Sequence, residues 1–322
     1  MRIDVALSVD DNYAKYCATA MCSILDNKNE CDEIFFHILH GDILDENIAR
    51  LAIFPNTKLY KLNESEFSPY VRRKKHVGFT PMFYRLKLAS ILKNIKKVIY
   101  LDCDIIVIKS LSELYSIDIS SYVVAAEPAL PPVPAETFSF YKSQMDRLGL
   151  PVLKDGFYFN SGVIYMNLEK IRNERIENDF FEYLKKNSQE IQFADQDTLN
   201  VVLQGKCLAL DSKFNFVPDP KYHNKEFCKT LPTDITILHF AGAKPWGKGF
   251  YNPFTEEFWK YYKKSGFVTE QEFSDQYNNY KKSRTKAAQI MLYLSRYPFA
   301  IFRPSKRKNL FEMFFPQNIF DI

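Results

Sequence analysis

Residues 97–108 read Lys97-Val98-Ile99-Tyr100-Leu101-Asp102-Cys103-Asp104-Ile105-Ile106-Val107-Ile108. This apolar strand is interrupted by two carboxylates, Asp102 and Asp104, spaced i, i+2. Alternation along an extended chain places both side chains on the same side. Two like charges beside apolar residues are costly unless a cation lies between them, and oxygen ligands suit Mg²⁺ or Mn²⁺. The pair therefore indicates a metal site that bridges to substrate phosphates, unless Asp102 simply caps a turn and Asp104 is solvated.

The chain up to this stretch alternates between predicted strands and predicted helices. An α/β fold with a mainly parallel central sheet, covered by helices on both faces, follows from that order. Ligands of such sheets bind beyond the carboxyl ends of the strands, where Asp10 and Asp102 both lie, so the two can share one crevice. The predicted strands are 3–9, 34–39, 58–62 and 98–101, and the predicted helices are 13–25 (with Tyr16, Ala20 and Ile24 on one face), 45–53 and 84–92.

The second half contains a polar turn at 158–162 that leads into a strand, followed by a predicted helix over 172–186. Asp195 then stands where a helix N-cap is expected. Neither a GxGxxG nor a GxxxxGK[ST] phosphate loop occurs in the sequence. A nucleotide would therefore be held through a metal ion and side chains.

The composition is that of a globular protein, with 322 residues, 46% hydrophobic and 25% charged. We expect one large domain over residues 1–260 and a helical C-terminal segment over 261–322. The six cysteines are scattered without CxxC pairs. With no export signal and no apolar stretch long enough to span a bilayer, we expect reduced thiols and a cytoplasmic protein, peripheral on the inner face of the cytoplasmic membrane if the C-terminal segment binds lipid.

The C-terminal segment is basic and aromatic. Residues 281–308 contain nine lysines and arginines and no acid, so the rest of the chain is net acidic although the whole carries +4. Residues 286–302 are apolar but broken at Pro298. Such a segment suits an anionic membrane surface, or else a C-terminal helix that packs on the body. Nucleic acid is disfavoured as a partner because the body is acidic and carries no nucleic-acid-binding motif.

Six segments, taken in order, carry a resemblance to a known family: Val9-Asp10-Asp11-Asn12-Tyr13, Tyr84-Arg85-Leu86-Lys87-Leu88, Tyr100-Leu101-Asp102-Cys103-Asp104, Phe159-Asn160-Ser161-Gly162, Asp195-Gln196-Asp197, and His239-Phe240-Ala241-Gly242 with Lys244-Pro245-Trp246. Over residues 3 to about 250 the chain resembles the family 8 glycosyltransferases, retaining enzymes that include bacterial lipooligosaccharide galactosyltransferases and glycogenin. The resemblance implies a GT-A fold, a UDP-hexose donor (galactose or glucose), a required Mn²⁺ (Mg²⁺ being possible) and a saccharide or glycolipid acceptor in cell-envelope or glycoconjugate synthesis.

The resemblance also implies roles for particular residues. The metal ligands would be Asp102, Asp104 and His239. The His239-to-Lys244 interval is one residue shorter than in some relatives, which affects the reach of Lys244 toward the diphosphate. The donor-binding residues would be Ser8, Asp10, Asn12 and Tyr13 for uracil and ribose, Gly242 and Lys244 for the diphosphate, and Arg85, Asn160, Asp195 and Gln196 for the sugar. Asp102, Cys103 and Ser161 would also bind the donor.

The catalytic residues would be Gln196, Asp195, Arg85 and Lys244. Gln196 is an amide and therefore a poor nucleophile, so front-face attack fits better than a double displacement through it. Two rival functions remain. Haloacid dehalogenase-like phosphatases also place DxD after an apolar strand, although their motif normally opens the domain, and here no later acidic GDxxxD pair follows. The other rival is a non-catalytic protein that only binds the sugar nucleotide.

Overall fold

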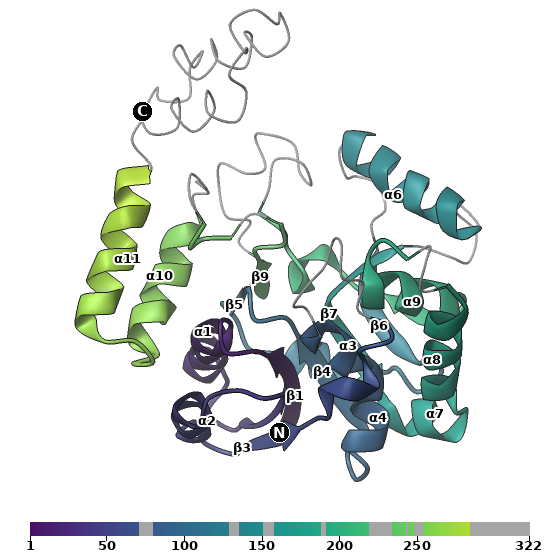
Figure 1. The fold of residues 1–322 in the computed structure, drawn as a ribbon, viewed down its shortest axis with the longest axis horizontal. Helices are drawn as coiled ribbons and strands as arrows, with labels where there is room; N and C mark the ends of the chain where they lie inside the picture. The colour runs from purple at the N-terminus through teal and green to yellow at the C-terminus, as the bar shows by residue number, and fades with distance from the viewer. Residues whose placement is uncertain are drawn as a thin grey trace, which may run out of the picture.

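The computed structural model of this protein describes residues 1–70, 80–128, 135–150, 158–187, 191–218, 234–242, 244–247 and 254–283 (Figure 1). The strands are β1 (Arg2–Val9), β2 (Glu33–His40), β3 (Thr57–Lys61), β4 (Lys97–Leu101), β5 (Ile105–Val107), β6 (Val124–Pro128), β7 (Phe159–Asn167), β8 (Cys207–Ala209) and β9 (Ile237–His239). The helices are α1 (Ala14–Asp26), α2 (Asp45–Ala52), α3 (Pro81–Tyr84), α4 (Leu88–Ile91), α5 (Ser112–Ser116), α6 (Ala135–Leu148), α7 (Leu168–Asn173), α8 (Ile176–Asn187), α9 (Ala194–Val202), α10 (Thr255–Lys264) and α11 (Glu270–Ser283), with 3₁₀ turns η1 (Glu64–Glu66), η2 (Arg85–Lys87) and η3 (Ser212–Phe214).

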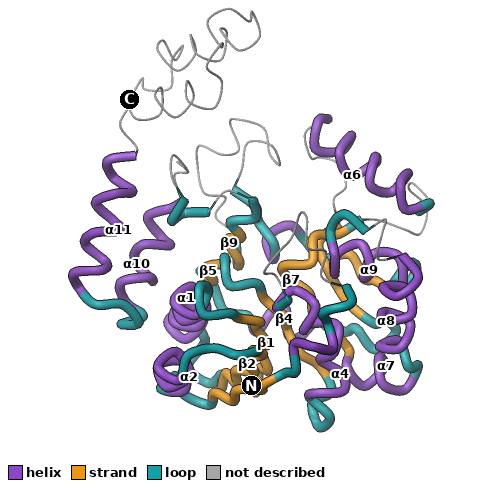
Figure 2. Tube along the Cα trace, in the orientation of Figure 1, coloured by secondary structure: helices purple, strands orange, loops and turns teal. Residues whose placement is uncertain are grey.

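The central sheet has the order β3-β2-β1-β4-β7-β6-β8. Figure 2 shows its strands in orange with helices on both sides. β3, β2, β1 and β4 are parallel, and β8 is parallel to β6. Only β7 in this sheet runs the other way, antiparallel to β4 and to β6. The predicted α/β fold with a mainly parallel sheet is confirmed. A separate two-stranded sheet pairs β5 with β9 in antiparallel register.

Alternating side chains of the central strands fill a core on each face of the sheet. On β4, Ile99 and Leu101 belong to the core beneath α1, whereas Val98 and Tyr100 belong to the core beneath α4, α7, α8 and α9. Figure 1 shows the same two groups of helices on opposite sides of the strands. The strand is buried on both faces, which explains its continuous apolar run. Helices on both faces leave the carboxyl edge of the sheet as the place where polar side chains gather.

Two predicted helices are broken in the structure. Residues 84–92 form the end of α3, then η2, then α4, and the backbone departs from helical dihedrals at Lys87, with φ −103° and ψ 6°. The predicted helix 172–186 is divided into α7 and α8 by Arg175, whose φ of 56° lies in the left-handed region. No glycine or proline marks that break in the sequence.

The N-cap prediction for Asp195 is wrong. The residue before α9 is Phe193, with no side-chain cap, and Asp195 lies in the first turn of the helix with its carboxylate turned toward Arg85. The N-cap expectation failed because a buried arginine from a distant segment provides a stronger partner than a helix N-terminus.

The described part of the C-terminal segment packs on the body. Asn27 of α1 donates to the Tyr261 hydroxyl of α10 at 2.7 Å, and the ring of Tyr262 lies 6.1 Å from that of Tyr16 between centroids. The division at residue 260 stays a prediction, and residue 260 itself lies inside α10. Within the described residues, no helix is both long and apolar enough to cross a membrane. Apart from Lys281 and Lys282 in α11, the basic residues predicted to contact a membrane lie outside the described residues.

Glu127, near the end of β6, provides a test of the packing at that edge. Burial, aided by the negative charge of Asp211, raises the pKa of Glu127 to about 8. In the unfolded chain this carboxyl ionises near its ordinary value of about 4.5, so the folded protein loses stability as pH rises from there through about 8. Glu127→Gln does not titrate. The melting temperature of Glu127→Gln minus that of the wild type should therefore be larger at pH 9 than at pH 5. The increase should be about 2–4 °C for each kcal/mol of stability that the wild type loses through ionisation of Glu127.

The comparison is made by calorimetry at both pH values. The exposed Glu182→Gln substitution in α8 serves as the control and should show the same difference from the wild type at pH 5 and pH 9. A Glu127→Gln melting difference that does not change with pH contradicts the raised pKa.

Candidate active site

A cleft lies beyond the carboxyl ends of β1 and β4, in two adjoining halves that share Met82, Arg85, Asp102, Asp104 and Lys244. The β1 half is also lined by Ser8, Asp10, Tyr13, Pro81, Tyr100 and Cys103. The β7 half is also lined by Asn160, Ser161, Gln192, Phe193, Asp195, Gln196, His239, Ala241 and Gly242. The expectation that Asp10 and Asp102 belong to one crevice is confirmed.

The sheet topology explains why residues so far apart in the chain meet here. Because β7 is antiparallel to β4, its N-terminal residues lie beside the C-terminal end of β4, and the Asp102 N–H donates to the Gly162 carbonyl at 2.8 Å. β9 pairs with β5, so that Ile105 lies opposite His239. This second sheet places the histidine next to Asp104, 135 positions earlier in the sequence.

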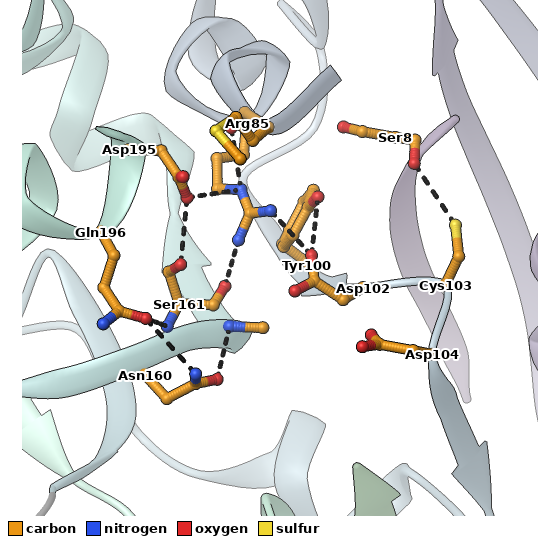
Figure 3. Close-up of polar contacts among 12 residues, drawn as sticks. Ser8, Arg85, Tyr100, Asp102, Cys103, Asp104, Asn160, Ser161, Asp195 and Gln196 are labelled. Atoms are coloured by element: carbon orange, nitrogen blue, oxygen red, sulfur yellow. Dashed lines mark hydrogen bonds and ion pairs between the residues drawn. The ribbon is translucent and has the colours of Figure 1, made fainter. Parts of the chain in front are cut away.

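Arg85 is the buried cation of the cleft, with only 4% of its surface exposed. Its Nη2 donates to Asp102 Oδ1 at 2.7 Å, its Nε lies 3.1 Å from Asp195 Oδ2, and the guanidinium also donates to the Ser161 carbonyl (Figure 3). Burial on its own would lower the pKa of Arg85, but the two carboxylates raise it above its ordinary value. Arg85 is therefore charged, and it joins β4, β7 and α9 at one point.

Asp104 is the second buried carboxylate, and it faces two basic side chains. His239 Nε2 lies 3.4 Å from Asp104 Oδ1, and Lys244 Nζ donates to Asp104 Oδ2 and, at 3.1 Å, to the Phe240 carbonyl. Burial would raise the pKa of Asp104, but the attraction of Lys244 and His239 outweighs it, and the pKa falls below the ordinary value. Asp104 is therefore ionised.

Asp102, Asp104 and His239 form a set of potential metal ligands whose contributing atoms all lie within 4.8 Å of one another. The His239 Nδ1 is 2.7 Å from Asn215 Oδ1 and donates to it in that amide orientation, which directs Nε2 toward the two carboxylates and makes Nε2 the atom that would bind an ion. Two carboxylates and an imidazole oriented in this way fit a divalent cation. Residues 102–104 form a bend rather than a continuation of β4, yet both carboxylates line both halves of the cleft, as the sequence predicted.

Gln196 is held by hydrogen bonds on both sides of its amide. Its Oε1 accepts from the Ser161 N–H at 3.1 Å and from Asn160 Nδ2 at 3.3 Å, and its Nε2 donates to the Tyr158 hydroxyl at 2.9 Å. The Tyr158 hydroxyl donates in turn to Asp197, which is fully buried. Since an ionised carboxylate only accepts, Tyr158 must offer its lone pair to Gln196, and this fixes which way the amide points. The oxygen of Gln196 thereby faces the start of β7.

The wall of the β1 half is aromatic. Tyr13 lines it, and its ring meets those of Tyr16 and Trp246 edge to face at 5.5 and 6.0 Å. Asp10 accepts from the Tyr13 N–H at 2.9 Å, and burial raises the pKa of its carboxyl. Asn12 is exposed in the same turn and is not among the described residues that line the cleft.

The sequence profile described as Glycosyl transferase family 8 matches residues 4–249. The chain belongs to glycosyl transferase family 8. It is 32% identical over 256 residues to a putative glycosyltransferase of Haemophilus influenzae, covering 76% of this chain and 73% of that protein. It is 29% identical over 274 residues to a lipopolysaccharide 1,2-glucosyltransferase of Escherichia coli, covering 81% and 76%. Among solved structures, it is similar to the galactosyltransferase LgtC in complex with donor and acceptor sugar analogs, with a TM-score of 0.71 and 26% identity over 85% of this chain and 100% of that one.

As a family 8 glycosyltransferase with the GT-A fold, the protein gathers nearly all of the sequence-predicted site residues in one cleft, Asn12 being the exception. Sequence reasoning missed the residues that support them. Gly162 was quoted only as part of a motif, although it determines how closely β7 approaches the ligand set. Asn215 and Tyr158 carry no local signal, since each acts through a partner 24 or 38 positions away.

Gly162 provides the first test of the ligand set. A Cβ at this position would lie 2.3 Å from His239 Cε1 and 2.8 Å from Asp102 Oδ2, closer than real contacts allow. Gly162→Ala must therefore displace the histidine and the carboxylate. We expect the affinity for Mn²⁺, measured by electron paramagnetic resonance titration, to fall about tenfold or more.

Gly41→Ala is the matched control, because its Cβ would meet only the flexible Glu64 side chain. It should bind Mn²⁺ as the wild type does. Unchanged Mn²⁺ affinity in a folded Gly162→Ala protein would show that these three residues do not hold the ion together.

Proposed function

We propose that the protein transfers a hexose from UDP-galactose or UDP-glucose to a saccharide acceptor, with retention at the anomeric carbon and with Mn²⁺ as the cofactor. The observation that carries this proposal is the convergence of Asp102, Asp104 and His239 between the two halves of the cleft. An ion held there would lie between a nucleotide in the β1 half and a sugar in the β7 half. That is the arrangement a metal–diphosphate site requires.

The β1 half suits a uridine. Tyr13 presents an aromatic wall backed by Tyr16 and Trp246, and Asp10 provides carboxylate oxygens for a pyrimidine edge. Ser8 and Cys103 lie in contact, with the thiol donating to the Ser8 carbonyl at 3.3 Å, and both line this half. Asn12 would reach the nucleotide only from the exposed turn beside Tyr13.

The diphosphate would lie over the shared residues. When bound, Mn²⁺ supplies Lewis-acid stabilisation of the negative charge that develops on the β-phosphate as UDP leaves. Lys244 carries a second positive charge on the same side, and its ammonium is held at the cleft by Asp104 and by the Phe240 carbonyl. Gly242 has φ +86°, a left-handed conformation that favours glycine, and this lets the backbone come close to a phosphate.

The hexose would lie in the β7 half, against Arg85, Asn160, Ser161, Asp195 and Gln196. Asp195 and the dipole of the Gln196 carbonyl would stabilise positive charge on the sugar ring as the bond to UDP breaks. The Gln196 oxygen already accepts from Asn160 and from Ser161, which disfavours attack by it. Front-face attack by the acceptor, with the β-phosphate taking the acceptor proton, is the mechanism that this arrangement favours.

The acceptor class follows from the relatives. A lipopolysaccharide glucosyltransferase among them supports a saccharide of the cell envelope, and a lipid-linked acceptor would suit a peripheral place on the inner face of the cytoplasmic membrane. Residues 281–308 would provide the anionic-lipid contact. A phosphatase function finds no support, because Asp102, its required nucleophile, has Oδ1 engaged by Arg85 and by the Tyr100 hydroxyl at 3.2 Å.

Metal dependence tests the proposed function. EDTA should abolish transfer from UDP-hexose, and Mn²⁺ should restore it better than Mg²⁺ or Ca²⁺. Asp104→Asn keeps the shape of the side chain but removes its charge, so activity should fall at least about a hundredfold, on the order of 3 kcal/mol of transition-state stabilisation. The measurement is UDP release and hexose transfer with a panel of UDP-sugars.

Asp42→Asn, an exposed aspartate paired with Lys61 at 2.6 Å, is the control and should keep wild-type activity. Full transfer in the presence of EDTA, or by Asp104→Asn, would remove the metal from the mechanism.

A further inference from the structure

An exposed pair of aromatic rings stands at the rim of the β7 half. Among the described residues, the large apolar side chains that remain exposed are Met1, Leu44, Ile53, Phe140 and Phe193. Two of these five touch each other: Phe140 and Phe193 meet edge to face with ring centroids 5.9 Å apart, and they are 43% and 39% exposed. Phe193 also lines the cleft beside Gln192 and Gln196.

Both rings are held in place by buried structure. Phe193 immediately precedes α9, and its N–H donates to the fully buried carboxylate of Asp197 at 3.0 Å. Phe140 is followed by the buried Tyr141, which packs with Tyr158 in a small core under α6. Arg147 of α6 donates to Asp197 at 2.8 Å, so the two segments that carry the rings are joined through one carboxylate. Both exposed rings are thus carried by segments that buried groups hold in place.

We propose that Phe140 and Phe193 form the platform on which the acceptor saccharide stacks, which rests on the proposed function. A pyranose ring offers an apolar face of C–H groups that packs on aromatic rings, while its hydroxyls need polar partners at the edge. Gln192, exposed beside Phe193 and part of the cleft lining, provides such a partner. A lipid chain would need a broader apolar surface than two rings with an amide beside them.

The position of the platform suits the acceptor rather than the donor. In the proposed function the donor hexose would lie deeper in the cleft, against Asp195 and Gln196. Asp195 is buried and accepts from the Ser161 hydroxyl, and the Gln196 oxygen accepts from the Ser161 N–H. Phe193 is only three residues from Gln196, but it belongs to the rim. A sugar stacked there would face the anomeric carbon of a hexose held in the β7 half.

The test separates acceptor binding from donor chemistry. Wild-type protein is first assayed with UDP-glucose and UDP-galactose, with Mn²⁺, for hydrolysis by water and for transfer to lactose, maltose and the core oligosaccharide released from lipopolysaccharide by mild acid. The KM for the best acceptor is then measured for the single variants Phe140→Ala, Phe140→Leu, Phe140→Trp and Phe193→Ala. It is also measured for the double variant that combines Phe140→Ala with Phe193→Ala. Ile53→Ala, which removes an 80% exposed apolar side chain elsewhere, is the control.

We expect acceptor KM to rise about tenfold in Phe140→Ala and Phe140→Leu, with donor hydrolysis changed less than twofold, and near-wild-type values for Phe140→Trp and Ile53→Ala. Because the rings touch, the fold increase of acceptor KM in the double variant should be smaller than the product of the two single-variant increases.

Unchanged acceptor KM in Phe140→Ala, or a rise in donor KM equal to the rise in acceptor KM, overturns the platform. If the wild type hydrolyses the donor but transfers the hexose to none of the saccharides, a saccharide is not the ligand of the Phe140–Phe193 platform. Absence of both hydrolysis and transfer in the wild type is a different result, which contradicts the proposed function itself.

Discussion

The Arg85 guanidinium, buried between Asp102 and Asp195, is the interaction on which the site depends. Taken out of water, two carboxylates so close to each other would repel, and removal of the cation between them would cost about 3–5 kcal/mol. A lysine could not replace it, because Arg85 uses a planar fork to reach Asp102, Asp195 and the Ser161 carbonyl at once. The antiparallel direction of β7 brings the Ser161 carbonyl beside the end of β4, where Asp102 lies.

A second group of opposite charges surrounds Asp104, two residues after Asp102. Asp104 faces Lys244 and His239, and the orientation of His239 is fixed by Asn215. Asp104 is therefore ionised before any ligand arrives. Such preorganisation reduces the reorganisation needed when charge develops on a leaving diphosphate. The same arrangement of side chains favours glycine at position 162, because any Cβ there would lie too close to His239 and Asp102.

Much of this could be predicted from residues 97–108 and a few short segments. The strand before Asp102 is apolar on both faces, and its carboxylates converge as the i, i+2 spacing predicted, even though residues 102–104 bend. The mainly parallel sheet followed from the alternation of strands and helices. The left-handed Arg175 could not be predicted, because an arginine gives no sign of positive φ.

Contacts that depend on tertiary structure could not be predicted from the sequence either. The N-cap expectation for Asp195 rested on local spacing, whereas its true partner is Arg85, 110 positions earlier in the sequence. The chain of bonds from Asp197 through Tyr158 to Gln196, and the aromatic pair above it, join α6, β7 and α9. Residues of this kind are found only when the fold has brought them together.

The measurement that tests the central claim most directly is a calorimetric titration of the full-length protein with UDP, in Mn²⁺ and then in EDTA, with ADP as the comparison nucleotide. If the cleft holds a diphosphate through an ion on Asp102, Asp104 and His239, UDP affinity should fall at least about tenfold without metal, and ADP should bind far more weakly than UDP in Mn²⁺. Equal UDP affinity in Mn²⁺ and EDTA, or equal affinity for UDP and ADP, would contradict the account.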